Sequence, residues 1–109
     1  MPKNRDNLRK EIERDMKSQL RKKGSTDKPY MDLVADYMEL WDIKNRLFDD
    51  IRSRGVVTKY NNGGGQSGSK QNDSVLAVIK VSDRMTKILD VLGIKPSAAT
   101  AADDGDCDL

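Results

Sequence analysis

The residues of this chain that could do chemistry fall into a glycine-rich run and a basic N-terminal segment. The run NNGGGQSGSKQNDS, from Asn61 to Ser74, invites comparison with a phosphate-binding P-loop, G-x-x-x-x-G-K-S/T. Gly63 and Gly68 stand at the two glycine positions, but Ser69-Lys70 follow in the reverse order. This order displaces the lysine from its phosphate and the hydroxyl from its magnesium. The spacing therefore argues against nucleotide binding.

Side chains for acid–base catalysis or metal binding are scarce. The chain has no histidine, and Cys107 is its single cysteine. Zinc fingers, Ser/His or Cys/His catalysis and an internal disulfide are thereby excluded. We expect a protein that is not an enzyme and that uses no metal or cofactor.

The basic segment covers the first 24 residues and contains nine basic and four acidic residues. The net charge of the whole chain is only +2. Two interpretations stay open: a solvated helix laced with salt bridges, or a surface that contacts phosphates. The cluster Arg21-Lys22-Lys23 has no acid beside it in sequence, which favours phosphate at that end. The candidate DNA contacts are Lys3, Arg5, Arg9, Lys10, Arg14, Lys17, Arg21, Lys22 and Lys23.

These residues must be positioned by a helix. Asn4 or Asp6 can cap it, and Gly24 stops it after about Lys22. A narrow apolar line repeats every four residues and predicts weak docking of this helix; it consists of Leu8, Ile12, Met16 and Leu20.

Two further helices are indicated by apolar stripes at helical spacing. The first has Pro29 in its first turn and runs to about Arg54, and Asp73 or Ser74 caps the second. Gly93 fits a left-handed C-terminal cap for the latter, which ends at about Leu92. Between the helices, residues 61–74 are expected to form a wide turn or a loop that stays mobile until something binds it. The run before it, residues 56–60, is β-prone and able to pair across the loop or with another chain, so a short β segment in this connection stays an alternative.

The predicted fold is all-α: a basic N-terminal helix (1–24), a long antiparallel helical hairpin (25–96, connection 55–74) and an acidic flexible tail (97–109). With 36% hydrophobic residues in 109, the core is thin, and the last helix is apolar on nearly every side. We therefore expect a homo-oligomer. Its predicted interface comprises Leu33, Tyr37, Trp41, Phe48, Val78, Met85 and Leu89.

Membrane insertion is not expected from this sequence. It contains no run of about eighteen apolar residues, and its start, MPKNRDNLRK, lacks the apolar centre of a signal peptide. We expect an intracellular protein.

Three segments in order resemble a known family. They are YMDLVADYMELWDIKNRLFDDIRSRGV, the glycine-rich run and ILDVLGIKPS, and together they span Tyr30 to Ser97. This order is similar to the small subunit of tailed-phage terminases, a family common in phages and prophages. The resemblance implies a ring of identical subunits in the host cytoplasm that binds double-stranded phage DNA at the packaging-initiation site. It also implies recruitment and regulation of the large subunit, which holds the ATPase and nuclease.

A different class of function also fits the helical hairpin. An oligomeric helical adaptor would use the same elements to bind protein partners rather than DNA. The acidic tail, with Asp103, Asp104, Asp106 and Asp108, would then be its binding end. Binding of duplex DNA at two salt concentrations separates these alternatives, because phosphate contacts make affinity fall steeply with salt.

Overall fold

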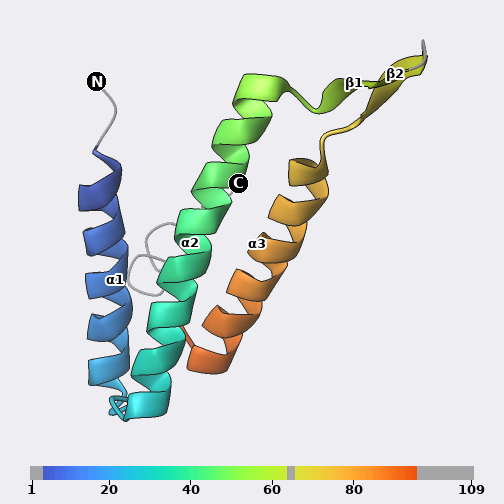
Figure 1. The fold of residues 1–109 in the computed structure, drawn as a ribbon. Coiled ribbons are helices and arrows are strands. Elements are labelled where there is room, and N and C mark those ends of the chain that lie inside the picture. Colours follow the sequence, from blue (N-terminus) through green and yellow to red (C-terminus); the bar gives the residue numbers. More distant parts are fainter. Residues whose placement is uncertain (1–3, 64–65, 96–109) are drawn as a thin grey trace, which may run out of the picture. The chain divides into compact units, whose positions relative to one another are not determined.

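The structure, a computed structural model, describes residues 4–63 and 66–95 and is mostly helical. Three helices and one two-stranded antiparallel sheet follow each other along the chain (Figure 1). Their bounds are α1 Arg5–Lys22, α2 Lys28–Arg54, β1 Val57–Gly63, β2 Gln66–Gln71 and α3 Asp73–Leu92. The three predicted helices are confirmed, and the sheet adds to the all-α expectation.

Helix α1 has the predicted caps. The Asn4 side chain accepts hydrogen bonds from the backbone N–H groups of Asp6 (2.7 Å) and Asn7 (3.3 Å). At the other end Gly24 takes a φ of 76°, a left-handed conformation that glycine adopts without strain. Met16 and Leu20 are buried. The predicted narrow apolar line thus docks the C-terminal half of α1.

Helix α2 begins and ends where its flanking residues predict. Pro29 is the second residue, where its missing N–H is harmless. Gly55, with a φ of 89°, follows the last turn and donates its N–H to the Ile51 carbonyl (2.7 Å).

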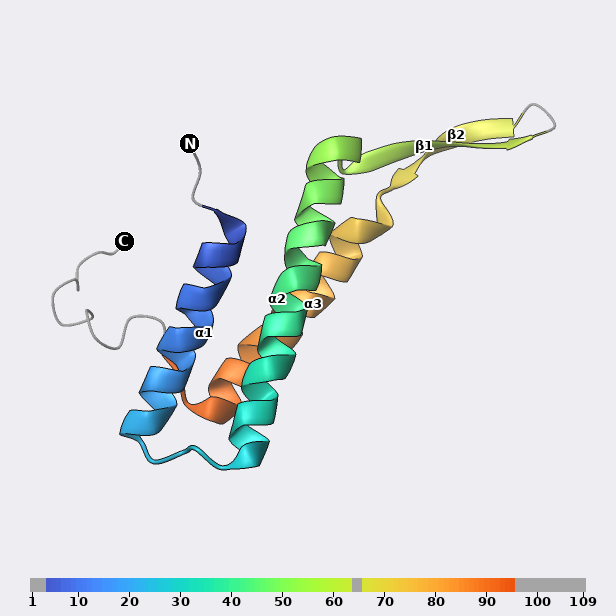
Figure 2. The ribbon, with the colours of Figure 1, turned by 60° about the vertical axis from the view of Figure 1, so that its left-hand side comes forward.

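The connection between α2 and α3 contains a β-hairpin, so the short β connection that the sequence allowed is present (Figure 2). Residues 66–71 of the glycine-rich run, expected in a wide turn or a mobile loop, form its second strand. Of the two pairings considered for the β-prone run, the one across the loop is observed: Val57 faces Gln71 and Lys59 faces Ser69. The strand Gln66–Gln71 was not predicted, because Gly and Ser have low strand propensity. Lys70 therefore lies within a strand, which agrees with the rejection of a P-loop.

The N-terminus of α3 corrects a second expectation. The cap is Asn72, not Asp73 or Ser74: its side-chain oxygen accepts the Ser74 N–H at 2.9 Å. The C-terminus follows the predicted Schellman pattern. Gly93 has a φ of 70°, and the Ile94 N–H donates to the Leu89 carbonyl at 3.0 Å.

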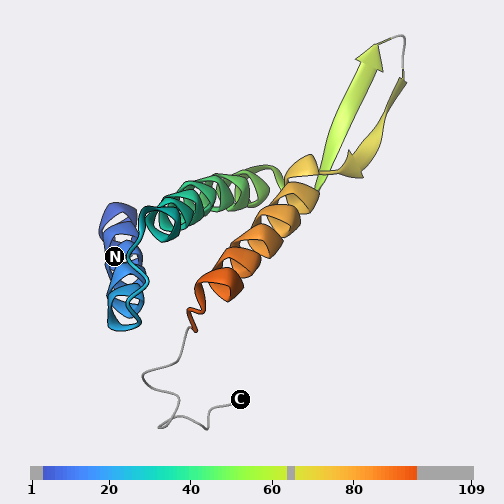
Figure 3. The ribbon, with the colours of Figure 1, turned by 90° about the horizontal axis from the view of Figure 1, so that it is seen from below.

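The chain divides into two compact units, one comprising residues 1–38 with 86–109 and the other residues 39–85. Buried apolar side chains of the first are Met16, Leu20, Val34, Met38, Ile88, Leu92 and Ile94. Those of the second are Trp41, Val78 and Met85. In the second unit the hairpin extends beyond the helix ends to which it is joined (Figure 3). The proposed division into N-terminal helix, hairpin core and tail stays a prediction, and the tail from residue 97 lies outside the described residues.

Candidate nucleic-acid interface

Helix α1 gathers part of the predicted basic set on one face. Lys10, Arg14, Lys17 and Arg21 follow each other at intervals of four, three and four residues, and with Glu13 they line one open depression. At 3.6 residues per turn, the middle of this basic stripe lies about 150° from the middle of the apolar line. The side of α1 opposite its buried face is therefore a cationic surface about 16 Å long.

Ion pairs neutralise only part of the basic stripe. The Lys17 ammonium lies 3.1 Å from the Glu13 carboxylate. The Arg9 guanidinium, which is outside the stripe, lies 3.9 Å from the same carboxylate. Within the described chain, Lys10, Arg14 and Arg21 have no carboxylate at ion-pairing distance. Exposed helix pairs of this kind contribute little stability. Among the described residues, the stripe thus combines one salt bridge with three cations that have no acidic partner.

The remaining predicted DNA contacts do not join the stripe. Arg5, Arg9 and Lys22 lie on other sides of α1, and Lys3 is outside the described residues. The Lys23 ammonium donates to the carbonyl oxygens of Leu92 and of Gly93, the latter at 3.0 Å. There it satisfies carbonyls at the end of α3 and complements the helix dipole. Sequence reasoning had no signal for this contact, since about seventy residues separate the partners.

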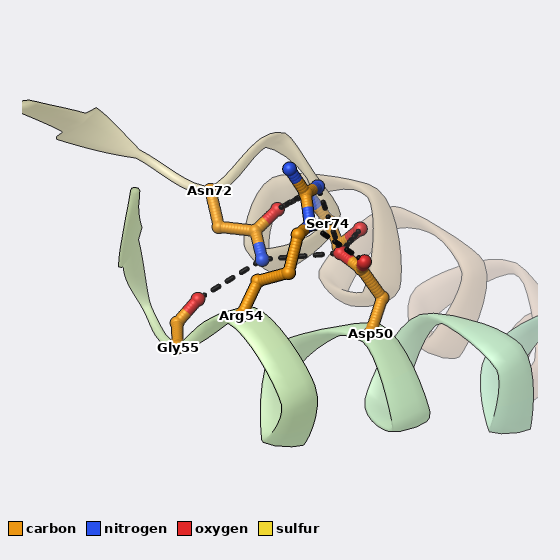
Figure 4. Close-up of polar contacts among 5 residues, drawn as sticks. All are labelled: Asp50, Arg54, Gly55, Asn72 and Ser74. Atoms are coloured by element: carbon orange, nitrogen blue, oxygen red, sulfur yellow. Dashed lines mark hydrogen bonds and ion pairs between the residues drawn. The ribbon is translucent and has the colours of Figure 1, made fainter. Parts of the chain in front are cut away.

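A second polar arrangement, the clasp, joins the end of α2 to the start of α3 and consists of Asp50, Arg54, Asn72 and Ser74 (Figure 4). Asp50 accepts hydrogen bonds from Arg54 (2.7 and 2.9 Å), from the Ser74 hydroxyl (2.7 Å) and from the Asn72 amide (3.1 Å). Every other member of the clasp therefore contacts the Asp50 carboxylate.

Asn72 is the buried centre of the clasp, with 1% of its surface exposed. Its amide nitrogen donates to the Gly55 carbonyl (2.9 Å) as well as to Asp50, and its side-chain oxygen accepts from Arg54 (3.1 Å). Its backbone N–H donates to the Val56 carbonyl at 2.6 Å. One residue thus caps α3, closes the end of α2 and holds the base of the hairpin.

The clasp also sets the ionisation of its charged members. Hydrogen bonds from Arg54, then Ser74 and Asn72, hold the pKa of Asp50 well below its ordinary value of 3.8. The hydrogen bond to Asp50 in turn raises the pKa of Arg54. Both shifts favour the charged forms, so the pair stays ionised at neutral pH.

Acid should weaken the fold through Asp50. Because the pKa of Asp50 is lower in the folded chain than in the unfolded chain, its contribution to stability is full above the unfolded pKa. The contribution decreases as pH falls below the unfolded pKa and is lost once pH has passed the folded one. We expect the stability difference between wild type and Asp50→Asn to shrink from about pH 6 to about pH 3, measured by urea unfolding.

The matched control is Asp36→Asn, which removes an exposed carboxylate from the same helix. Its difference from wild type should change less over this range. A constant Asp50→Asn difference would show that the clasp does not depend on the carboxylate charge.

Residues predicted for an oligomer interface differ in exposure. Trp41, Val78 and Met85 are buried within the single chain, whereas Phe48 is exposed. Leu33, Tyr37 and Leu89 are half-buried. Exposed large apolar residues that the prediction did not include are Leu8, Ile43, Val56, Val57, Leu76, Ile79 and Val91. Whether these surfaces contact another copy stays a prediction.

Among the described residues, no group of histidine, cysteine and acidic side chains is arranged to hold a metal ion. None of the described helices is both long and apolar enough to cross a membrane.

The fold and the basic stripe define a small helical protein with a cationic helix face and a β-hairpin between its two longer helices. A family model described as phage terminase, small subunit, matches residues 10–105, which is nearly the whole chain. The chain therefore belongs to the phage terminase small-subunit family, whose general role is in phage genome packaging. Neither a curated protein nor a solved structure shows significant similarity to it.

Proposed function

We propose that this chain binds double-stranded phage DNA at the packaging-initiation site through the basic stripe of α1. It then recruits and regulates the terminase large subunit, which supplies the ATPase and nuclease. The observation that carries the DNA proposal is the position of Lys10, Arg14 and Arg21 on the side of α1 opposite the buried Met16 and Leu20. A helix docked by one face and cationic on the other suits contact with phosphates.

Exposed apolar residues lead to a proposal about assembly. Exposed Ile43 and Phe48 on α2 and Leu76 and Ile79 on α3 leave apolar surface on both long helices of the chain. We propose that copies of the chain cover these residues and form a homo-oligomeric ring in the host cytoplasm. Several stripes on one frame would then bind DNA together, so that modest single contacts give high avidity.

Neutralising the stripe tests the DNA proposal. The variant Lys10→Gln/Arg14→Gln/Arg21→Gln keeps good helix formers and removes three charges. The slope of log affinity against log salt should flatten by about 0.9 for each phosphate that the variant no longer neutralises. We expect a slope flatter by up to about 2.7 per subunit engaged and much weaker binding at low salt. Fluorescence anisotropy on a short mixed-sequence duplex at several salt concentrations measures both.

The matched control removes three charges elsewhere, as Lys28→Gln/Arg46→Gln/Lys80→Gln, all at exposed positions. It should bind nearly as wild type does. Equal losses in both variants would indicate a general effect of net charge. Binding unchanged by the stripe variant would remove α1 from the DNA site, and a wild-type protein without duplex binding would favour the protein adaptor.

A further inference from the structure

We propose that one face of the β-hairpin enters the major groove of double-stranded DNA and forms a second contact, separate from the α1 stripe. This ribbon face is formed by Lys59, Ser69 and Gln71. The inference rests on the proposed DNA-binding function and extends it from phosphate contact on a helix to groove contact on a strand pair.

The charge of the hairpin segment is the first argument. The chain contains 18 acidic residues, yet none falls between Gly55 and Asn72, where Lys59 and Lys70 are the two charged residues. A segment without acids presents no repulsion to phosphates. Lys70 forms an ion pair with Asp73 of α3 at 3.6 Å, so Lys59 is the cation that the hairpin offers to phosphates.

The strand register places suitable side chains together. Lys59 faces Ser69 and Val57 faces Gln71, while Thr58 faces Lys70. Because directly facing residues share a side of the sheet and successive residues alternate, Lys59, Ser69 and Gln71 lie on one side and Lys70 on the other. All three residues of the ribbon face are exposed. Lysine, glutamine and serine can each hydrogen-bond to base edges in the major groove.

The architecture of the hairpin fits the same ligand. The B-DNA major groove, about 12 Å wide, admits a two-stranded ribbon, and several DNA-binding proteins read bases in this way. Within the described chain, the sheet has only these two strands. Val57, which faces Gln71 and therefore lies on the same side as the ribbon face, is 59% exposed. A strand added from a second copy is less favoured, because Gly68, Ser69 and Gln71 supply little apolar surface and low strand propensity.

The clasp gives the hairpin a fixed attachment. Asn72, immediately after β2, is buried and joins the Gly55 carbonyl, which precedes β1, to the Asp50 carboxylate. A connection that served only as a flexible linker between α2 and α3 would not need these hydrogen bonds. Holding the base of the ribbon reduces the conformational entropy that is lost when it binds.

Two variants with matched chemistry test the inference, because each facing pair contains one lysine and one hydroxyl. The ribbon-face variant is Lys59→Gln/Ser69→Ala, and the opposite-face variant is Lys70→Gln/Thr58→Ala. On the mixed-sequence duplex we expect about a tenfold loss of affinity for the first, with a slope flatter by about 0.9, and less than about a twofold loss for the second. Circular dichroism melting checks that both fold.

A duplex whose major groove is filled by glucosylated 5-hydroxymethylcytosines tests the groove directly. Wild type should bind this duplex less tightly than the unmodified one, and the ribbon-face variant should discriminate less between the two. Equal losses in the two variants, no loss in the ribbon-face variant, or unchanged discrimination would each overturn the inference. A changed molar mass of the ribbon-face variant in light scattering, with unchanged DNA binding, would instead assign this face to contact between copies and overturn it.

The stripe variant of α1, measured in the same series, separates this inference from the proposed function. Loss of binding in the stripe variant alone would overturn the ribbon contact and leave the stripe in place. Loss in the ribbon-face variant alone would support the ribbon and overturn the assignment to α1. Absence of duplex binding by wild type would overturn the DNA-binding function and the ribbon contact with it.

Discussion

Replacing Trp41 with alanine should lower the free energy of unfolding by about 3 to 5 kcal/mol. The Trp41 side chain is 5% exposed, so the change removes a large buried ring and leaves a cavity that the surrounding structure fills only in part. Urea unfolding followed by circular dichroism measures the loss.

The control for this prediction is Ile43→Ala, two residues away on the same helix, where the side chain is 40% exposed. It should cost clearly less than Trp41→Ala, about 1 kcal/mol or below. The dependence on protein concentration adds a second test. Because Trp41 is buried within its own chain, its loss should be the same at every concentration, whereas an interface residue would show a larger loss in dilute protein. Equal losses from the two substitutions would contradict the placement of Trp41 in the core.

Apart from the start of α3, the helix ends were predictable because their signals are local. A side-chain oxygen at Asn4 and glycines at positions 24, 55 and 93 act on backbone groups within a few residues. Such interactions depend on the sequence immediately around them. The three helices could therefore be predicted closely from the sequence alone.

The hairpin was only half predictable because its second strand has a composition that disfavours strands. The second strand is stabilised by its pairing with β1 and by the hydrogen bonds of Asn72, which compensate for its low strand propensity. The same network explains why the cap of α3 was misassigned. Asp73 and Ser74 are good capping residues in isolation, but Asn72 is the residue that also reaches Gly55 and Asp50, 17 and 22 residues earlier in the chain.

The candidate DNA site was also predictable only where local sequence determines the position of a residue. The helical period could have separated Lys10, Arg14, Lys17 and Arg21 from the other basic residues, since a continuous α1 determines which side each one occupies. The contact of Lys23 with the end of α3 could not have been found in this way. It depends on tertiary packing, which brings the Lys23 ammonium close to Gly93. A Cβ at position 93 would collide with the ammonium in this position.

The clasp is where a single substitution should disturb three elements at once. Asn72→Ala removes the cap of α3, which is typically worth about 1 kcal/mol. It also leaves the Gly55 carbonyl without the Asn72 amide and deprives Arg54 of an acceptor, and an unsatisfied buried group costs about 1 to 3 kcal/mol. The total loss of unfolding free energy should therefore be about 2 to 4 kcal/mol.

Asn45→Ala is the matched control, because the Asn45 amide donates to the Trp41 carbonyl of its own helix at 2.8 Å. In the part of the chain that the structure describes, this amide bonds to no second element. It should change the unfolding free energy by about 0.5 kcal/mol or less. Hydrogen exchange then locates the effect of Asn72→Ala: the amides of Gly55 and Ser74 should exchange faster, whereas that of Leu8 in α1 should not change beyond the general loss of stability. Equal acceleration along the whole chain, or a loss no greater than that of Asn45→Ala, would mean that hairpin and helices hold together without the clasp.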